Sequence, residues 1–130
     1  MKRCEWDQSL ETGISEVDIQ HRVLFNLAKI LLDSLDMNRE DEVIDGVLDE
    51  LTRYTIYHTV TESAYHIGSE DDLLEHQEAH KGFIDKVGAF KKKRKDMGNK
   101  EFASFLANFV CAWIEDHIKG MDMRDLPKKS

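Results

Sequence analysis

Apolar side chains recur every three or four residues along four stretches of the chain, which is the spacing of one face of an α-helix. Polar residues fill the positions between them, so each stretch predicts an amphipathic helix with one buried face. Capping and turn residues place these helices at about 19–36, 40–67, 70–96 and 100–119. Residues 1–17 show no sustained period and predict an extended arm lying over the helices.

Residues with strong capping or turn preferences stand at the predicted helix ends. Asp18 and Asn99 are expected as N-caps of the first and last helices, and Ser69 opens a capping box before the third. Gly68 and Gly120 are expected just past the ends of the second and fourth helices, because glycine is favoured after a helix C-terminus. The connections between the predicted helices are therefore short.

Few residues in the chain interrupt helices, since it contains only Pro127 and seven glycines among 130 residues. This length suits one domain with a single core, so we expect residues 1–130 to form one unit. Helices joined by short connections pack antiparallel to their neighbours. The predicted fold class is therefore all-α, an up-down-up-down antiparallel four-helix bundle with an N-terminal extended arm.

The charge and the apolar content argue against several partners. A formal net charge of −8 argues against nucleic acid or an anionic membrane surface as the main partner. No apolar run approaches the roughly 20 residues needed to cross a bilayer, and the N-terminus lacks the apolar segment of a signal peptide. We therefore expect a cytoplasmic protein in which Cys4 and Cys111 are reduced thiols, with a bridge between them as the alternative.

Histidine and carboxylate side chains occupy positions in the apolar stripes where leucine or phenylalanine would be expected. His58 and Glu62 are four residues apart, as are His76 and His80, so each pair lies one turn apart on one helix face. In an up-down-up-down bundle, the starts of the first and third helices lie beside the ends of the second and fourth. One end of the bundle is therefore expected to gather the candidate metal ligands, which are His21, His58, Glu62, His76, His80, His117 and Asp122.

So many polar groups in one core layer predict a metal centre. An unpaired buried polar side chain costs on the order of a few kcal/mol, and a bound metal removes that penalty. Five imidazoles and two carboxylates exceed the four ligands of one tetrahedral zinc ion and suit two ions that share bridging carboxylates. Imidazole with carboxylate fits iron in a helical bundle. For any one of these histidines alone, a satisfied core or boundary residue is the simpler interpretation.

The spacing of these residues resembles the hemerythrin family, in particular its single-domain bacterial members, over nearly the whole chain. The motifs that carry the resemblance are Trp6-x3-Leu10-x2-Gly13, Asp18-Ile19-Gln20-His21, His58-x3-Glu62, His76-x3-His80 and Trp113-x3-His117-x4-Asp122. The resemblance implies two iron ions per chain, Fe²⁺ or Fe³⁺, with a bridging oxo or hydroxo group. One iron would take the three histidines of the third and fourth helices. The other would take His21 and His58, and Glu62 and Asp122 would bridge the two ions.

The resemblance also implies an open position for O₂ on the iron with fewer histidines, which small anions can occupy in the oxidised form. The second helix departs from the family pattern, because Thr59, Ser63 and His66 stand where phenylalanine, glutamate and methionine are usual. None of these changes removes a ligand. His66 could reach the pocket and donate to bound oxygen or an anion, and the alternative is a boundary histidine. The residues expected to line the pocket and exclude water are Leu24, Phe25, Trp113 and Ile114.

The leading functional prediction is reversible O₂ binding by a non-enzymatic carrier, storage or delivery protein. Because neutral imidazoles outnumber carboxylates among the ligands, we expect reversible binding to be favoured over oxygen activation. One alternative is an O₂ or redox sensor that signals to an unidentified protein partner. The other is a di-iron enzyme that consumes peroxide or nitric oxide.

Overall fold

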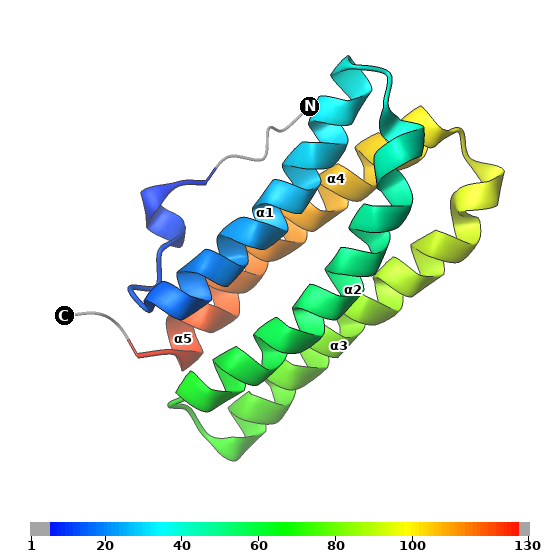
Figure 1. The fold of residues 1–130 in the computed structure, drawn as a ribbon. Helices are drawn as coiled ribbons and strands as arrows, with labels where there is room; N and C mark the ends of the chain where they lie inside the picture. The colour runs from blue at the N-terminus through cyan, green and yellow to red at the C-terminus, as the bar shows by residue number, and fades with distance from the viewer. Residues whose placement is uncertain (1–5, 128–130) are drawn as a thin grey trace.

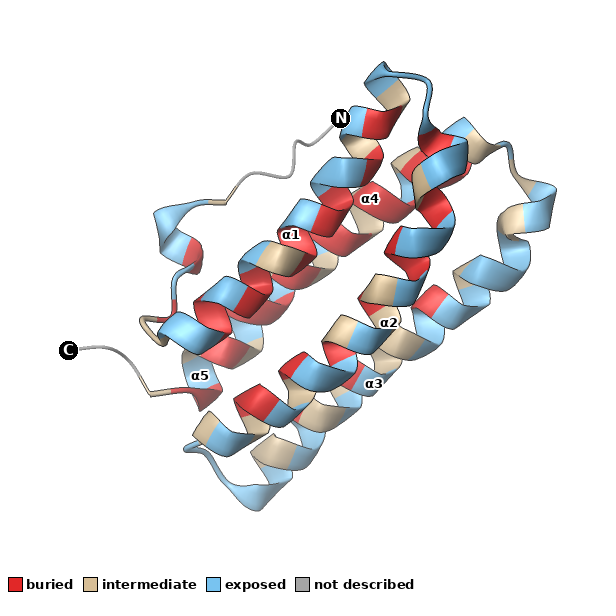
Figure 2. Cartoon of the chain, in the orientation of Figure 1, coloured by how far each residue is buried: buried red, intermediate tan, exposed pale blue. Residues whose placement is uncertain are grey.

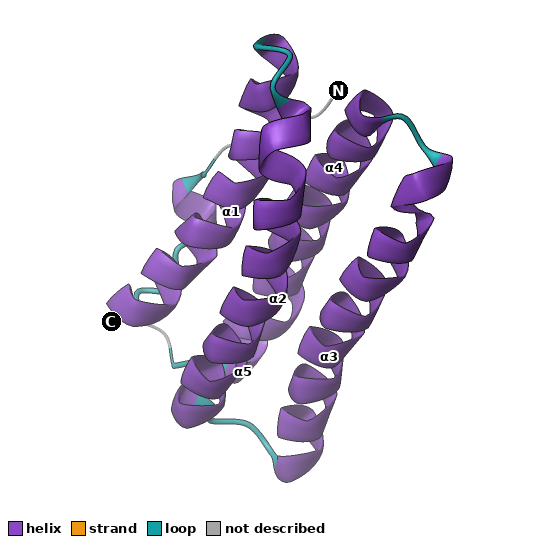
Figure 3. Cartoon of the chain, turned by 45° about the vertical axis from the view of Figure 1, so that its right-hand side comes forward, coloured by secondary structure: helices purple, strands orange, loops and turns teal. Residues whose placement is uncertain are grey.

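The computed structural model describes residues 6–127 as a bundle of four long helices (Figure 1). α1 (Ser15–Asp36) and α3 (Glu70–Lys93) run in one direction, and α2 (Glu40–Tyr65) and α4 (Asn99–His117) run in the other. Within these residues there is no strand (Figure 3). The prediction of an all-α, up-down-up-down four-helix bundle is confirmed. None of the helices in this part of the chain is both long and apolar enough to cross a membrane.

The apolar stripes of the helices meet in one core along the bundle axis (Figure 2). α1 packs against α2 and α4, and α2 also contacts α3. Where α3 faces α4, Phe83 contacts Phe109 and Trp113, with ring centroids 5.7 and 4.5 Å apart. Each large side chain contributes about 1.5–3 kcal/mol by leaving water. The largest of the fully buried apolar side chains are Leu24, Leu31, Ile44, Leu48, Leu51, Phe83, Phe102, Leu106, Ile114 and Ile118.

The start of α1 differs from the prediction, because the helix begins at Ser15 and Asp18 is not its N-cap. The Asp18 carboxylate lies buried in the first turn and accepts hydrogen bonds from the Thr12 amide and hydroxyl at 2.8 and 2.9 Å. It also accepts one from the Gly13 amide at 3.1 Å. Asp18 therefore holds the turn that joins the arm to the helix. The described arm is correspondingly shorter, covers residues 6–14 and contains the short 3₁₀ turn η1 (Gln8–Leu10); residues 1–5 lie outside the described part.

The other helix boundaries lie within a few residues of the predicted ones. α2 ends at Tyr65, so Gly68 lies in the connection and not directly after the helix. Ser69 is the N-cap of α3, and its hydroxyl accepts a hydrogen bond from the Asp72 amide at 3.1 Å. α3 is extended by the 3₁₀ turn η2 (Arg94–Asp96). Asn99 is the first residue of α4 and not its cap.

The end of α4 departs most from the prediction, because Gly120 does not stop the helical path. The chain continues through the π-helical turn η3 (Ile118–Asp122) into the short α5 (Met123–Asp125). The Met123 amide donates to the carbonyl of Ile118, five residues back, as in a π-helix. Five residues of α-helix at about 100° each would turn Asp122 roughly 140° away from His117. The wider π turn brings both side chains to the same side.

Cys111 is not a free thiol, because its sulfur takes part in a disulfide bond. The prediction of reduced cysteines is therefore wrong for this residue. Whether a cysteine can be bridged depends on distances of a few ångströms in the folded chain, which the separation of cysteines along a sequence does not reveal. Cys4 lies outside the residues that the structure describes.

Candidate metal centre

Each helix carries its candidate ligands near the same end of the bundle. α1 contributes a histidine from its second turn, α2 contributes a histidine and a glutamate from its last two turns, and α3 contributes two histidines from its first half. The last turn of α4 and the π turn contribute a histidine and an aspartate. All seven side chains are at most 7% exposed. The structure thus brings together every candidate ligand, namely His21, His58, Glu62, His76, His80, His117 and Asp122.

These side chains form two groups that share one carboxylate. Within each group, one ligand atom from every residue lies within 4.8 Å of all the others. The arrangement has the composition expected for two neighbouring cation sites with a common bridging ligand. The first group contains Glu62, His76, His80 and His117, and the second contains His21, His58, Glu62 and Asp122.

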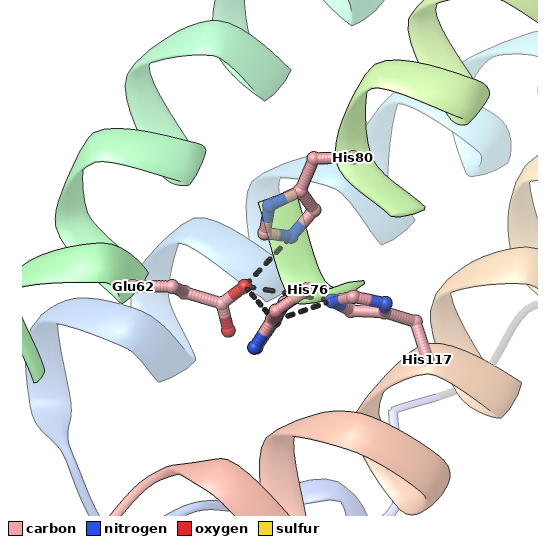
Figure 4. Close-up of side chains that lie close together, drawn as sticks. All are labelled: Glu62, His76, His80 and His117. Carbon is pink, nitrogen blue, oxygen red and sulfur yellow. Dashed lines mark hydrogen bonds and ion pairs between the residues drawn. The ribbon is translucent and has the colours of Figure 1, made fainter. Parts of the chain in front are cut away.

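Glu62 lies at the centre of the cluster, where four imidazoles surround its Oε1 (Figure 4 draws three of them). Oε1 lies 2.9 Å from Nε2 of His58 and 2.8 Å from Nε2 of His80. The Nε2 atoms of His76 and His117 follow at 3.3 and 3.5 Å. A carboxylate oxygen has about two lone pairs, so it cannot accept a good hydrogen bond from all four rings. Ordinary hydrogen bonding to Glu62 therefore does not account for all four rings, whereas metal ions that the same side chains could hold would account for them.

Asp122, which lies in the π turn η3, also contacts histidines of both groups. Its Oδ2 lies 3.0 Å from Nε2 of His21, and its Oδ1 lies 2.9 Å from Nε2 of His76 and 3.2 Å from Nε2 of His117. The second oxygen of Glu62 also approaches His21, at 3.2 Å. Each carboxylate thus contacts histidines of both groups. This is the geometry required of a bridging ligand.

The two carboxylates raise the pKa values of three histidines. Burial alone would lower the pKa of His21, but interactions with Asp122 and Glu62 outweigh it and raise this pKa to about 9. The same balance raises the pKa of His76 to about 10 and also raises the pKa of His117. Against the effect of burial, the imidazoles lower the pKa of Asp122 to about 2 and hold the pKa of Glu62 well below its usual range. In the metal-free protein, protons thus supply the positive charge that balances the carboxylates.

His58 and His80 behave in the opposite way. Burial is the largest effect on both and outweighs their interactions with Glu62. It lowers the pKa of His58, and it lowers the pKa of His80 to about 4. Both rings are therefore neutral at pH 7. A neutral imidazole is the form that binds a metal ion, so these two rings are ready to act as ligands without losing a proton.

Several buried polar atoms in the cluster make no well-aligned hydrogen bond among the described residues, although some of them lie within 3.2 Å of one another. They include both ring nitrogens of His21 and His80, Nε2 of His58 and both carboxylate oxygens of Asp122. A buried polar group left unpaired costs about 1–3 kcal/mol. Imidazole nitrogens and carboxylate oxygens are ligands that iron and zinc accept. The residues present therefore fit a centre of two metal ions.

Two further residues contact the outer nitrogens of candidate ligands, and sequence reasoning assigned neither of them a role. Oε1 of Gln20 lies 2.7 Å from Nδ1 of His58, and its Nε2 donates to the hydroxyl of Thr61 at 2.9 Å. Oδ2 of Asp125 lies 3.1 Å from Nδ1 of His76. Gln20 could have been suspected as a polar residue next to a candidate ligand. Asp125 gave no periodic signal, because it follows the π turn.

The residues predicted to line an O₂ pocket stand three or four positions from His21 or His117, about one helical turn away. Leu24, Phe25 and Ile114 are buried in the core. The Trp113 ring is stacked on the ring of His117, with centroids 4.6 Å apart and an angle of 11° between their planes. The Trp113 contact places an apolar side chain of α4 against a candidate ligand. The role of the four residues as a pocket is still a prediction.

His66 lies just after the last residue of α2 and groups with His76 and Asp125. Its Nε2 is 3.0 Å from the carbonyl oxygen of Ser69, and its ring centroid is 6.5 Å from that of His76. The open position for O₂ is expected on the other side of the cluster, near His21. Neither of these contacts of the His66 ring supports its predicted role as a donor to bound oxygen, which stays a prediction.

The family profile described as Hemerythrin HHE cation binding domain matches residues 12–128. The chain is 31% identical over 123 residues to a bacteriohemerythrin of Clostridium acetobutylicum, which covers 90% of this chain and 94% of the relative. It is also 31% identical over 121 residues to a hemerythrin-like protein of Naegleria gruberi (92% and 87%) and 27% identical over 134 residues to a bacteriohemerythrin of Pseudomonas aeruginosa (94% and 78%). No solved structure matches the chain significantly.

Proposed function

The chain belongs to the hemerythrin family, as the motifs predicted, and on that premise we propose that it binds O₂ reversibly at a non-haem di-iron centre. The observation that carries the proposal is that the buried histidines and carboxylates form two clusters with Glu62 in common. Two bound iron ions would supply the electrons and the open coordination position that O₂ binding needs. The role we propose is that of a carrier, store or delivery protein, without catalytic turnover.

We assign the three histidines of α3 and α4 to one iron, and His21 and His58 to the other. Glu62 and Asp122 contact histidines of both sets and are assigned as bridging ligands. The distances of 2.8–3.5 Å between their oxygens and ring nitrogens of both sets support the bridging role, and the two groups of mutually close ligand atoms support the division. The second set has only two imidazoles, so the open position for O₂ is assigned to that side.

Apolar side chains on α1 and α4 shield both iron sites from water. Leu24 and Phe25 on α1 and Ile114 on α4 are buried apolar residues about one helical turn from His21 and His117 in the chain. Trp113 covers the face of the His117 ring. An apolar shell limits the access of water and so slows oxidation of the reduced centre. The chain thus contributes ligand atoms, their spacing and the exclusion of solvent.

Iron analysis and visible absorption spectroscopy test the proposal. We expect about two irons per chain, one for each group of ligands. The reduced protein should develop an absorption band in air that disappears when O₂ is removed and returns when it is readmitted. A purified protein that takes up no iron would overturn the proposal. Immediate and irreversible oxidation in air would overturn reversible binding and favour a di-iron enzyme.

Substitution of single histidines makes the test specific. His80→Ala removes a buried ring from the first group, so iron content should fall clearly below that of the unmodified protein. His66→Ala is the matched control, because His66 is the one histidine of six that lies outside the candidate ligands. It should retain about two irons per chain. Equal iron loss in both variants would contradict the assignment.

A further inference from the structure

The Asp125 side chain holds the outer side of the His76 ring. Its Oδ2 lies 3.1 Å from Nδ1 of His76, while Nε2 of the same ring faces Glu62 and Asp122. Asp125 is completely buried. The ring is thus contacted through both nitrogens, one toward the candidate metal centre and one toward a carboxylate outside it.

Arg124 keeps this carboxylate charged and in place. Its guanidinium group donates from Nε to Oδ1 of Asp125 at 2.6 Å and from Nη2 to Oδ2 at 3.0 Å, a two-pronged contact. Nη1 of Arg124 donates to Glu75 at 3.2 Å, and Nη2 lies 3.8 Å from a carboxylate oxygen of Asp72. Both acidic residues belong to α3, the helix that carries His76. The Arg124 side chain that holds Asp125 is therefore itself bound to the helix that carries His76.

The main chain of Asp125 is held independently of its side chain. Its carbonyl oxygen accepts a hydrogen bond from the Ile67 amide at 2.8 Å, which ties the C-terminal segment to the connection between α2 and α3. The neighbouring Leu126 amide donates to the carbonyl oxygen of Asp122 at 3.0 Å. A change in the Asp125 side chain can therefore remove the contact with His76 while these backbone bonds persist.

A third cation between His66, His76 and Asp125 is a competing interpretation, because these three residues also cluster within 4.8 Å. Two observations disfavour it. Both carboxylate oxygens of Asp125 already accept from the positively charged Arg124. Nε2 of His66 already faces the Ser69 carbonyl oxygen. Nδ1 of His66 has no hydrogen-bond partner within the described part of the chain, but the single carboxylate of the trio is already neutralised by the guanidinium group of Arg124, which would repel a second cation.

The outer ring nitrogen of His76, Nδ1, faces a charged carboxylate, which distinguishes His76 from three other candidate ligands. Nδ1 of His58 faces the neutral amide of Gln20. Nδ1 of His21 and Nδ1 of His80 have no hydrogen-bond partner within residues 6–127. A carboxylate on the outer nitrogen increases the electron density at the inner nitrogen and fixes which nitrogen is the ligand. The cluster is therefore electronically asymmetric.

We infer that Asp125 is a positioning residue for His76: its ionised carboxylate accepts the Nδ1 proton, directs Nε2 to the iron held by the α3 and α4 histidines, and strengthens that bond. The inference rests on the proposed di-iron function. Because a more basic ligand stabilises ferric more than ferrous iron, the contact also lowers the reduction potential of the centre.

The test compares Asp125→Asn, Arg124→Met and a control in the iron-loaded protein. Asp125→Asn keeps the size of the side chain and removes its charge, so iron affinity measured by chelator competition should fall about 10- to 100-fold. The midpoint potential should become more positive. Arg124→Met keeps the Asp125 carboxylate but removes its two hydrogen bonds from the guanidinium group. It should change iron affinity and midpoint potential in the same direction as Asp125→Asn, but by less. Glu40→Gln is the matched control, because it neutralises another buried carboxylate, at the end of α2 opposite to the candidate centre.

The inference is overturned if Asp125→Asn binds iron with unchanged affinity and unchanged potential. It is also overturned if Glu40→Gln shifts the potential as much as Asp125→Asn, since the effect would then be a general one of lost burial or stability. If the unmodified protein takes up no iron, the proposed function fails and this inference fails with it. If the unmodified protein takes up two irons and only the Asp125 result is negative, the proposed function stands alone.

Discussion

The metal-free protein is expected to lose stability as the pH rises from 6.5 to 9. The carboxylates of Glu62 and Asp122 outweigh the effect of burial and raise the pKa values of His21, His76 and His117. Above pH 6.5 the unfolded chain has released its histidine protons, whereas the folded state still holds protons in the cluster. The folded state therefore binds more protons, and the free energy of unfolding falls as the pH rises.

The magnitude follows from the raised pKa of His21. A rise from 6.5 to about 9 corresponds to about 3 kcal/mol at 1.36 kcal/mol for each pKa unit. The three protonated rings share the same two carboxylates, so their effects do not simply add. Counting one retained proton gives a loss of about 3 kcal/mol between pH 6.5 and 9, or roughly 10 °C in melting temperature for a chain of this size.

The assay is thermal unfolding of the metal-free and iron-loaded proteins at pH 6.5, 7.5, 8.5 and 9 (roughly the span set by the ordinary and raised pKa values). In the iron-loaded protein the ring nitrogens hold metal in place of protons, so this alkaline loss should disappear. Burial lowers the pKa of His80 to about 4, so the metal-free protein should also lose stability from pH 6.5 down to 4. A metal-free melting temperature that stays constant or rises between pH 6.5 and 9 would refute the reasoning.

Three other substitutions follow from the packing. Phe102 is fully buried near the start of α4, so Phe102→Ala should lower the free energy of unfolding by about 3–5 kcal/mol in denaturant titrations. The iron content of the folded protein should stay unchanged. A loss of iron would contradict the separation of this part of the core from the metal centre. Thr55→Val should be neutral or stabilising by up to about 1–3 kcal/mol, because the buried Thr55 hydroxyl has no hydrogen-bond partner among the described residues; a clear loss of stability would show that the hydroxyl is used. Gln20→Met removes the contact with His58 and should weaken iron binding about 10- to 100-fold in chelator competition. Gln77→Met, which loses only a hydrogen bond to the Ser63 hydroxyl, is its control, and an equal effect in both would count against Gln20.

The sequence by itself determined the helices, their order and the residues that meet at one end of the bundle. Helical periodicity shows which face of each helix is apolar, and short connections force neighbouring helices to run antiparallel. Histidines placed early in α1 and α3 and late in α2 and α4 must then lie at one level. These relations depend only on positions along single helices and on chain direction. For this reason the convergence of His58, Glu62, His76 and His80 could be predicted without coordinates.

Only the tertiary structure decided the contacts between segments that periodicity does not relate. Gln20 reaches His58 across 38 positions of the chain, and Asp125 reaches His76 across 49. The π turn that brings Asp122 beside His117 has no marker in the residues that form it, since glycine at position 120 suggested an end to the helix. Such features depend on which side chains meet after packing, and the energy of that packing is not a property of any one stretch. The candidate ligands therefore follow from the sequence, whereas the residues that contact their outer nitrogens follow from the fold.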